Sequence, residues 1–66
     1  MVCDEVKRYR LNALYSRREL GELLGFRGRT AESVIQKWET GERNVPLKHF
    51  RKLHELLKIP YEKLIP

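Results

Sequence analysis

The sequence predicts a compact all-α domain of five short helices. Apolar residues recur at helical spacing in several segments, and we expect no strand. Ser16 followed by Glu19 is a capping-box pattern that starts a helix, while Gly25 and Gly41 are placed where glycine commonly ends one. The 66 residues are expected to form a single domain, residues 1–66, with a core of marginal size.

The first two helices are expected over residues 4–13 and 17–24. Asp4 and Glu5 suit the start of the first helix, because acidic groups are favourable at the positive end of a helix dipole. Ser16 is the expected N-cap of the second helix. The expected inward-facing residues are Val6, Tyr9, Ala13 and Leu14 in the first helix and Leu20, Leu23 and Leu24 in the second.

Three more helices are expected after a loop at residues 26–29. The third begins near Thr30, a candidate N-cap. The fourth begins around Pro46, which suits a first-turn position. The expected ranges are 30–38, 46–58 and 60–64, and the residues assigned to the interior are Val34, Ile35 and Trp38 in the third helix and Leu47, Phe50, Leu53 and Leu57 in the fourth.

The chain is basic, with a net charge of +5 and a pI near 9.7. A pI above about 9 in a small domain is typical of nucleic-acid binding, although solubility with accidental affinity for polyanions is the alternative. No apolar run approaches the roughly 20 residues of a membrane span, and nothing resembles a signal peptide. We therefore expect a soluble, cytoplasmic protein that does not associate with membranes.

Residues suited to catalysis or metal binding are sparse. Cys3, His49 and His54 are the available ligands, and the spacing of the two histidines keeps them off a shared helix face. No nucleophile is accompanied by a histidine and an acid in a recognisable order, and there is no phosphate-binding loop. We expect no enzymatic activity, no catalytic residue, no metal or cofactor, and no small-molecule substrate.

Three sequence patterns occur in a characteristic order: Ser16-x-x-Glu19-Leu20-Gly21-x-x-Leu24-Gly25, Ile35-x-x-Trp38-Glu39-x-Gly41 and Phe50-x-x-Leu53-x-x-x-Leu57-x-Ile59. Their order and spacing resemble the DNA-binding domain of phage Cro and lambda-type repressors, the XRE-like helix-turn-helix family, from Val6 to Leu64. The resemblance implies that the second and third helices form the helix-turn-helix and that the third enters the DNA major groove. It also implies an ion pair between Arg10 and Glu39, and dimers that regulate transcription from two-fold operators.

One segment departs from the family pattern. The stretch between Gly25 and Trp38 is longer, by about four residues, than the tight turn usual for this motif. Either the turn is a longer loop, or the third helix gains a turn at its N-terminus. We therefore expect a five-helix, lambda-repressor-like domain with a lengthened turn, which leaves open which side chains of the third helix reach base edges.

Candidate base-reading residues lie on the third helix, opposite its apolar stripe. Matched backwards from Trp38, the resemblance places the family's reading positions on Glu32, Ser33 and Lys37, and Gln36 lies nearby. Lysine can donate to guanine O6 and N7, serine to several base edges, and glutamate can accept from cytosine N4. The alternative for each of these residues is an ordinary solvated helix face.

Candidate phosphate-binding residues flank the same surface. Arg17 starts the second helix and Arg43 lies in the loop after the third, where the resemblance implies backbone contacts. Arg27 and Arg29 in the long turn could act similarly, and a shifted turn would bring Arg29 and Thr30 into the reading surface. Surface arginines that contact only solvent are the alternative for any one of them.

The sequence thus predicts a sequence-specific regulator that binds double-stranded DNA, and the resemblance favours a repressor over an activator. A protein-interaction module of the same fold, such as an antitoxin-like partner, is the main alternative, because a fold does not fix a function. Binding to structured RNA is a third possibility. A homodimer is expected through the apolar C-terminal end, which comprises Ile59, Pro60, Tyr61, Leu64, Ile65 and Pro66. The alternative for this end is that Leu64 packs back onto the first helix.

Overall fold

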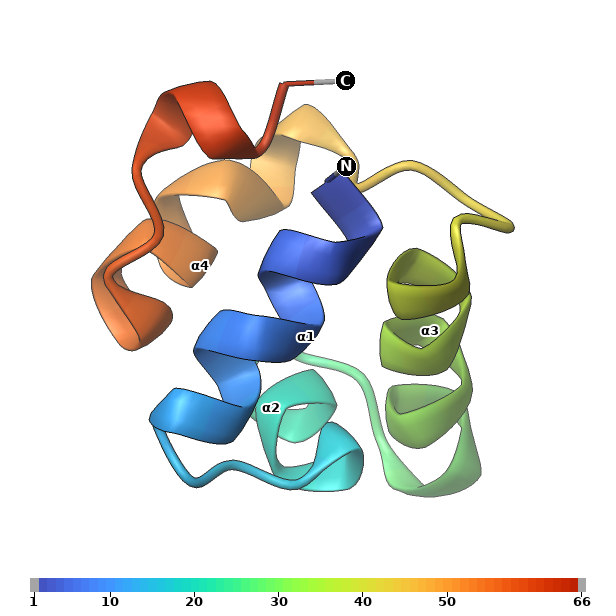
Figure 1. The fold of residues 1–66 in the computed structure, drawn as a ribbon. Helices are drawn as coiled ribbons and strands as arrows, with labels where there is room; N and C mark the ends of the chain where they lie inside the picture. Colours follow the sequence, from blue (N-terminus) through green and yellow to red (C-terminus); the bar gives the residue numbers. More distant parts are fainter. Residues whose placement is uncertain (1, 66) are drawn as a thin grey trace.

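The structure, a computed structural model, describes residues 2–65, and this part of the chain contains helices and no strand. Four α-helices and two single-turn 3-10 helices follow one another along the chain (Figure 1). They are α1 (Val2–Asn12), α2 (Arg17–Leu23), α3 (Gly28–Thr40), η1 (Leu47–His49), α4 (Phe50–Leu57) and η2 (Tyr61–Lys63). The prediction of an all-α domain is confirmed.

The prediction of five α-helices is wrong at the C-terminal end. Pro46 is extended, with φ −63° and ψ 143°, and the chain passes through η1 before α4 begins at Phe50. The last predicted helix is the single turn η2, in which the backbone N–H of Lys63 donates to the carbonyl oxygen of Pro60 at 3.0 Å. So short a segment forms the tighter 3-10 turn because it has no length for an α-helical ladder.

The start of α2 has the predicted capping box. The backbone N–H of Glu19 donates to Ser16 Oγ at 3.0 Å, and the backbone N–H of Ser16 donates to Glu19 Oε1 at 2.9 Å. Hydrogen bonds with Ser16 lower the pKa of the Glu19 carboxyl from its ordinary value of 4.5. The bond with the Ser16 backbone has the larger effect and the bond with its side chain the smaller one. The capping carboxylate therefore stays ionised and fixes where α2 begins.

Two glycines set the geometry between α2 and α3. A Cβ atom at Gly21 would lie 2.4 Å from the carbonyl oxygen of Ala31, so only glycine allows the two helices to approach this closely. Gly25 has φ +103°, a left-handed conformation that turns the chain away from α2. Together they bring α2 against the buried side of α3.

The prediction of a lengthened turn is wrong, and the alternative given with it is confirmed: the additional residues belong to the N-terminal end of α3. Only residues 24–27 separate α2 from α3, and α3 begins at Gly28. Arg27 occupies the N-cap position without a side-chain cap, so the prediction of Thr30 as N-cap is also wrong. Phe26 packs edge-on against Trp38, with ring centroids 6.3 Å apart, and this contact returns the chain to α3 after a short turn.

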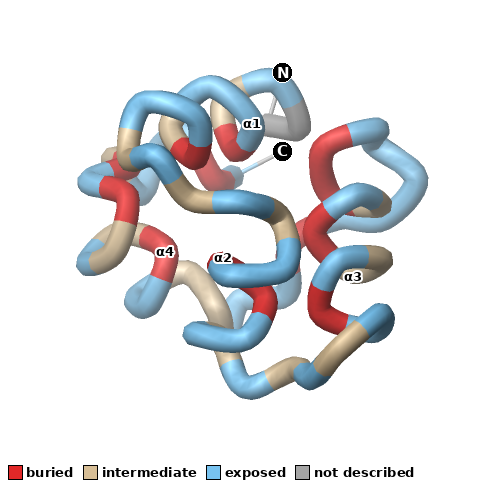
Figure 2. Tube along the Cα trace, turned by 90° about the horizontal axis from the view of Figure 1, so that it is seen from below, coloured by how far each residue is buried: buried red, intermediate tan, exposed pale blue. Residues whose placement is uncertain are grey.

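The core lies between α1, α2, α3 and the C-terminal helices, and Figure 2 shows buried positions on the inward side of each. Three residues predicted to face inward are instead exposed: Leu14 by 87%, Leu47 by 79% and Leu23 by 45%. All three lie at or beyond an element's end, where helical periodicity no longer determines direction. The fully buried large side chains are Val6, Leu20, Ile35, Leu53, Ile59 and Leu64.

A histidine closes the core beside α3. The His49 ring lies 5.3 Å from the Phe26 ring and 5.4 Å from the Trp38 ring, between centroids. Its Nε2 atom is buried and has no hydrogen-bond partner among residues 2–65. Removal of the ring from water lowers the pKa of His49 from its ordinary value of 6.5, and the charge of Lys48 lowers it further. The cluster therefore favours the neutral form of the imidazole.

We expect acid to destabilise the fold through His49. Above pH 6.5 the imidazole is neutral in the folded and the unfolded chain. As the pH falls below that value, the unfolded chain binds a proton that the folded chain binds only at lower pH, so the free energy of unfolding decreases. Urea unfolding between about pH 5.5 and 7.5 should therefore show a flatter pH dependence for His49→Phe than for wild type.

The control for this experiment is His54→Gln, which leaves the aromatic cluster intact. The His54→Gln variant should have the same pH dependence as wild type and should therefore still differ from His49→Phe. Identical pH profiles for wild type and His49→Phe would mean that the cluster does not depend on a neutral His49.

Candidate nucleic-acid interface

Helix α3 has one buried and one outward face. Ala31, Ile35 and Trp38 are buried against the rest of the domain, together with Glu39 (Figure 2). On the other side, Thr30, Glu32 and Gln36 are exposed, and Ser33 and Lys37 are half-buried. The five candidate reading residues on α3 are therefore accessible on the surface that α3 presents to solvent.

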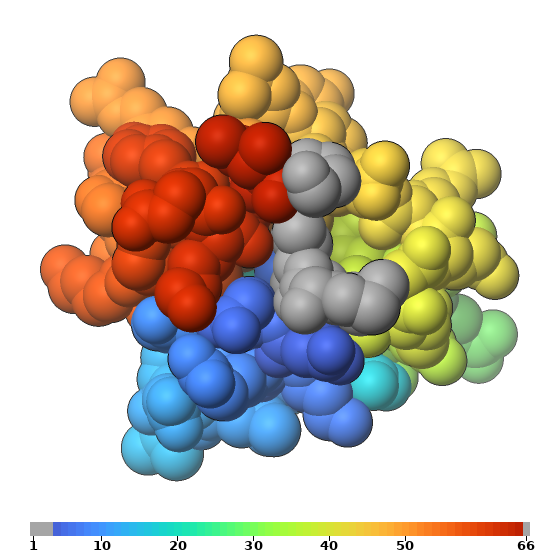
Figure 3. Space-filling view, turned by 45° about the horizontal axis from the view of Figure 1, so that its top comes forward, coloured from blue at the N-terminus to red at the C-terminus, as the bar shows by residue number. Residues whose placement is uncertain are grey.

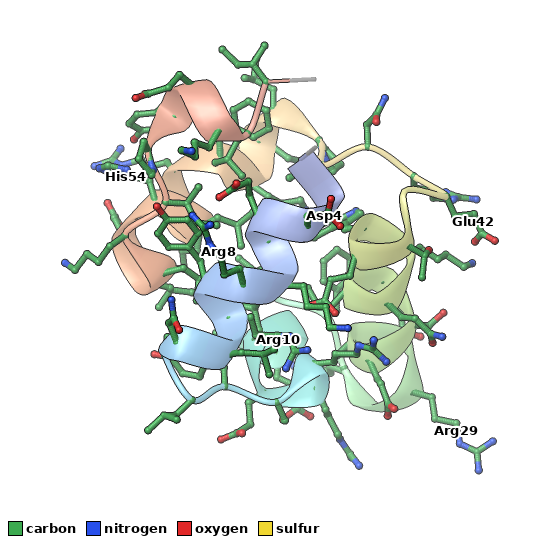
Figure 4. All side chains as sticks on the ribbon, in the orientation of Figure 1. Asp4, Arg8, Arg10, Arg29, Glu42 and His54 are labelled. Carbon is green, nitrogen blue, oxygen red and sulfur yellow. The ribbon has the colours of Figure 1, made fainter. Side chains whose placement is uncertain are left out.

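The early start of α3 lengthens this outward surface. Residues three, four, seven or eight positions apart share a helix face, so Arg29 begins a stripe that continues through Ser33 to Lys37. At 1.5 Å per residue the stripe is about 12 Å long. Figure 4 shows Arg29 at the beginning of α3, directed away from the domain.

The loop after α3 returns to the end of this stripe. Gly41, with φ 81°, ends α3 as the sequence predicts. The backbone N–H of Arg43 then donates to the carbonyl oxygen of Lys37 at 3.2 Å. This bond holds the exposed Arg43 next to the last outward-facing turn of α3.

The arginines of the domain are neutralised unevenly, whereas lysines without an ion pair among the described residues are spread over several elements: Lys7, Lys37, Lys48, Lys52 and Lys58. On the outer helix surfaces, arginines pair with glutamates one turn away: Arg8 with Glu5 at 3.1 Å, Arg18 with Glu22 at 3.5 Å and Arg51 with Glu55 at 3.2 Å. Three arginines have no ion pair within the described part of the chain: Arg27, Arg29 and Arg43. All three flank α3, although the exposed acids Glu32 and Glu42 also lie on this helix and its following loop.

The predicted ion pair between Arg10 and Glu39 is confirmed. Arg10 Nε donates to Glu39 Oε2 at 2.5 Å and Arg10 Nη2 to Glu39 Oε1 at 3.3 Å. Arg10 extends from α1 toward α3 (Figure 4), and its Nη1 also donates to the carbonyl oxygen of Tyr15 at 2.9 Å. The Glu39 side chain is only 1% exposed, so this pair is buried.

Arg17 takes part in the same cluster, which sequence reasoning missed. Its Nε donates to Glu39 Oε1 at 3.0 Å, while a third of its side chain remains exposed. The sequence separation of Arg17 and Glu39 gives no local signal for this contact. Arg17 is thus a tethered side chain at the start of α2, whereas the other three candidate phosphate-binding arginines are unpaired.

The chain matches the helix-turn-helix family model over residues 6–64. It therefore belongs to the XRE-like helix-turn-helix family of DNA-binding transcription regulators. Comparisons with curated proteins and with solved structures give no match.

Two further searches of the described residues are negative. They contain no group of three or more histidine, cysteine, aspartate or glutamate side chains placed to hold a metal ion. None of their helices has the length and apolar character needed to cross a membrane.

Proposed function

We propose that this protein binds a specific sequence of double-stranded DNA, with α3 in the major groove, and represses transcription in the cytoplasm. The observation that carries the proposal is the placement of the unpaired arginines, all of which flank the outward face of α3. Unpaired arginines favour a polyanionic partner, because phosphates can replace the glutamates that neutralise arginines elsewhere on the domain. Repression requires only that the bound protein occupies a site that other factors need.

The residues of this surface fall into two groups, according to the part of the DNA that they are proposed to contact. Side chains on the outward face of a helix in the major groove meet base edges, whereas side chains at helix starts and loops meet the sugar-phosphate backbone. The proposed base-facing residues are Thr30, Glu32, Ser33, Gln36 and Lys37, and the proposed phosphate-binding residues are Arg17, Arg27, Arg29 and Arg43.

We also propose that the protein binds DNA as a homodimer, in the manner of the phage Cro and lambda-type repressors it resembles. The expected contact surface needs correction, because Ile59 and Leu64 are buried in the core. The exposed apolar residues at this end are Leu47, Ile65 and Tyr61, which are 79%, 61% and 45% exposed. Pro60 is half-buried, and Pro66 lies outside the described residues. Figures 1 and 3 show η1 and the segment that follows η2 at the same end of the molecule.

The first test is the salt dependence of binding to duplex DNA. Each phosphate contact releases counterions, so affinity should fall by orders of magnitude between about 50 and 200 mM salt if six or more phosphates are contacted. Fluorescence anisotropy with labelled duplexes measures this. Replacing Arg29 or Arg43 by glutamine should make the negative slope of log K against log salt less steep, by roughly one unit for each substitution.

A matched control is Arg51→Gln on α4. It removes the same charge from an arginine that is already paired with Glu55 and lies outside the proposed surface. Its slope should equal that of wild type. Wild-type protein that fails to bind duplex DNA even at low salt would reject the proposal and favour the protein-interaction module.

The second test separates base reading from phosphate binding. Lys37→Ala should weaken binding to the preferred site by about 1–3 kcal/mol and relax the choice at one base position. Arg43→Ala should weaken binding to all sequences about equally. Titrations of both variants against the preferred site and its single-base variants measure the difference.

Arg29→Ala is the comparison that locates α3 along the groove. If Lys37→Ala lowers every affinity equally while Arg29→Ala changes the preferred base, the N-terminal turn of α3 reads the DNA. The assignment of Lys37 would then be wrong.

A further inference from the structure

The two arginines that share Glu39 differ in how fully their hydrogen-bonding capacity is used. Arg10 uses all three of its nitrogens: Nε and Nη2 on Glu39, and Nη1 on the carbonyl oxygen of Tyr15. Arg17 uses only Nε, and its two Nη groups have no hydrogen-bond partner among the described residues. Arg10 is 8% exposed by side chain and Arg17 is 33% exposed.

The cluster retains positive charge at its exposed side. Two guanidinium groups face one carboxylate, so one charge is left uncompensated, and each of the three nitrogens of the buried Arg10 already has a partner. The remaining capacity lies at the Nη end of Arg17. A guanidinium group held at one edge presents its other N–H groups in a fixed plane, which suits recognition of a phosphate.

We propose that Glu39 is a positioning residue for DNA binding: by holding Nε of Arg17, it fixes the two Nη groups of Arg17 for a phosphate. Glu39 itself touches no DNA and acts through Arg17. This inference rests on the proposed function, since it concerns how the same surface holds a phosphate. It gives the buried carboxylate a second role besides joining α1 to α3.

The direction in which Glu39→Gln changes DNA affinity distinguishes a positioning role of Glu39 from simple neutralisation of Arg17. Glu39→Gln raises the net charge by one, so if Glu39 only neutralised Arg17, the variant should bind DNA more tightly. If Glu39 positions Arg17, the variant should bind more weakly, by about tenfold, because an unrestrained arginine must lose side-chain freedom on binding. Anisotropy at a temperature where circular dichroism shows the variant folded measures this.

Glu22→Gln is the matched control. Glu22 pairs with Arg18 on the exposed side of α2, so this variant adds the same charge and releases an arginine outside the cluster. It should bind duplex DNA as tightly as wild type or more tightly. Weaker binding by both variants to the same degree would reject the positioning role.

A double-mutant cycle tests whether Glu39 affects DNA affinity through Arg17 or indirectly, through the position of α3. In an Arg17→Ala background, Glu39→Gln should change DNA affinity by less than about twofold, because the side chain through which it acts is gone. Its effect on thermal stability should persist in that background, since Arg10 still loses its partner. An undiminished effect on affinity without Arg17 would overturn the inference.

A lysine substitution decides the question if Glu39→Gln does not fold. Arg17→Lys keeps the charge but cannot hold Glu39 and present two further N–H groups in one plane. It should weaken binding by about tenfold while Arg18→Lys stays within about twofold of wild type. Equal affinities of Arg17→Lys and wild type would reject the inference, whereas failure of wild type to bind duplex DNA would instead reject the proposed function.

Discussion

The buried carboxylate of Glu39 is the contact on which the arrangement of the first three helices depends. It receives Arg10 from α1 and Arg17 from the start of α2, and it belongs to the last turns of α3. Removing one partner of a buried ion pair costs about 3–5 kcal/mol, because the other charge stays buried without compensation. A folded protein has only about 5–15 kcal/mol of stability in total, so losing one partner from this cluster would remove a large part of it.

The close contact between α2 and α3 determines which side of α3 faces outward. With no side chain at Gly21, α2 lies against the backbone of Ala31 and covers the apolar stripe of α3. Phe26, Trp38 and His49 close the same interface from the turn and from η1. The opposite stripe is therefore held on a rigid helix, and the loop bond from Arg43 to Lys37 fixes a cation at its end.

Local signals in the sequence predicted local structure well. The capping box of Ser16 and Glu19, the helix end at Gly41 and the inward positions of Ile35 and Trp38 all follow from residues close together in the chain, and the structure has them. The family pattern added one distant contact, between Arg10 and Glu39, which no local rule supplies.

Features that depend on distant packing were not predictable in the same way. Ile59 and Leu64 look like an exposed apolar end in sequence, but the chain folds back and buries them. The start of α3 at Gly28 depends on how Phe26 packs against Trp38, and the pairing of Arg17 with Glu39 depends on where α2 meets α3. In short segments such as η1 and η2, periodicity cannot distinguish an α-helix from a single 3-10 turn.

Selection of bound duplexes from a random pool shows whether the outward stripe of α3 reads a DNA sequence. We expect an enriched motif that occurs twice with two-fold symmetry, with half-site centres about one helical turn apart. An enriched single half-site would retain the reading function and reject the dimer. A pool that stays random after repeated selection, despite salt-sensitive binding, would contradict the claim that α3 reads bases.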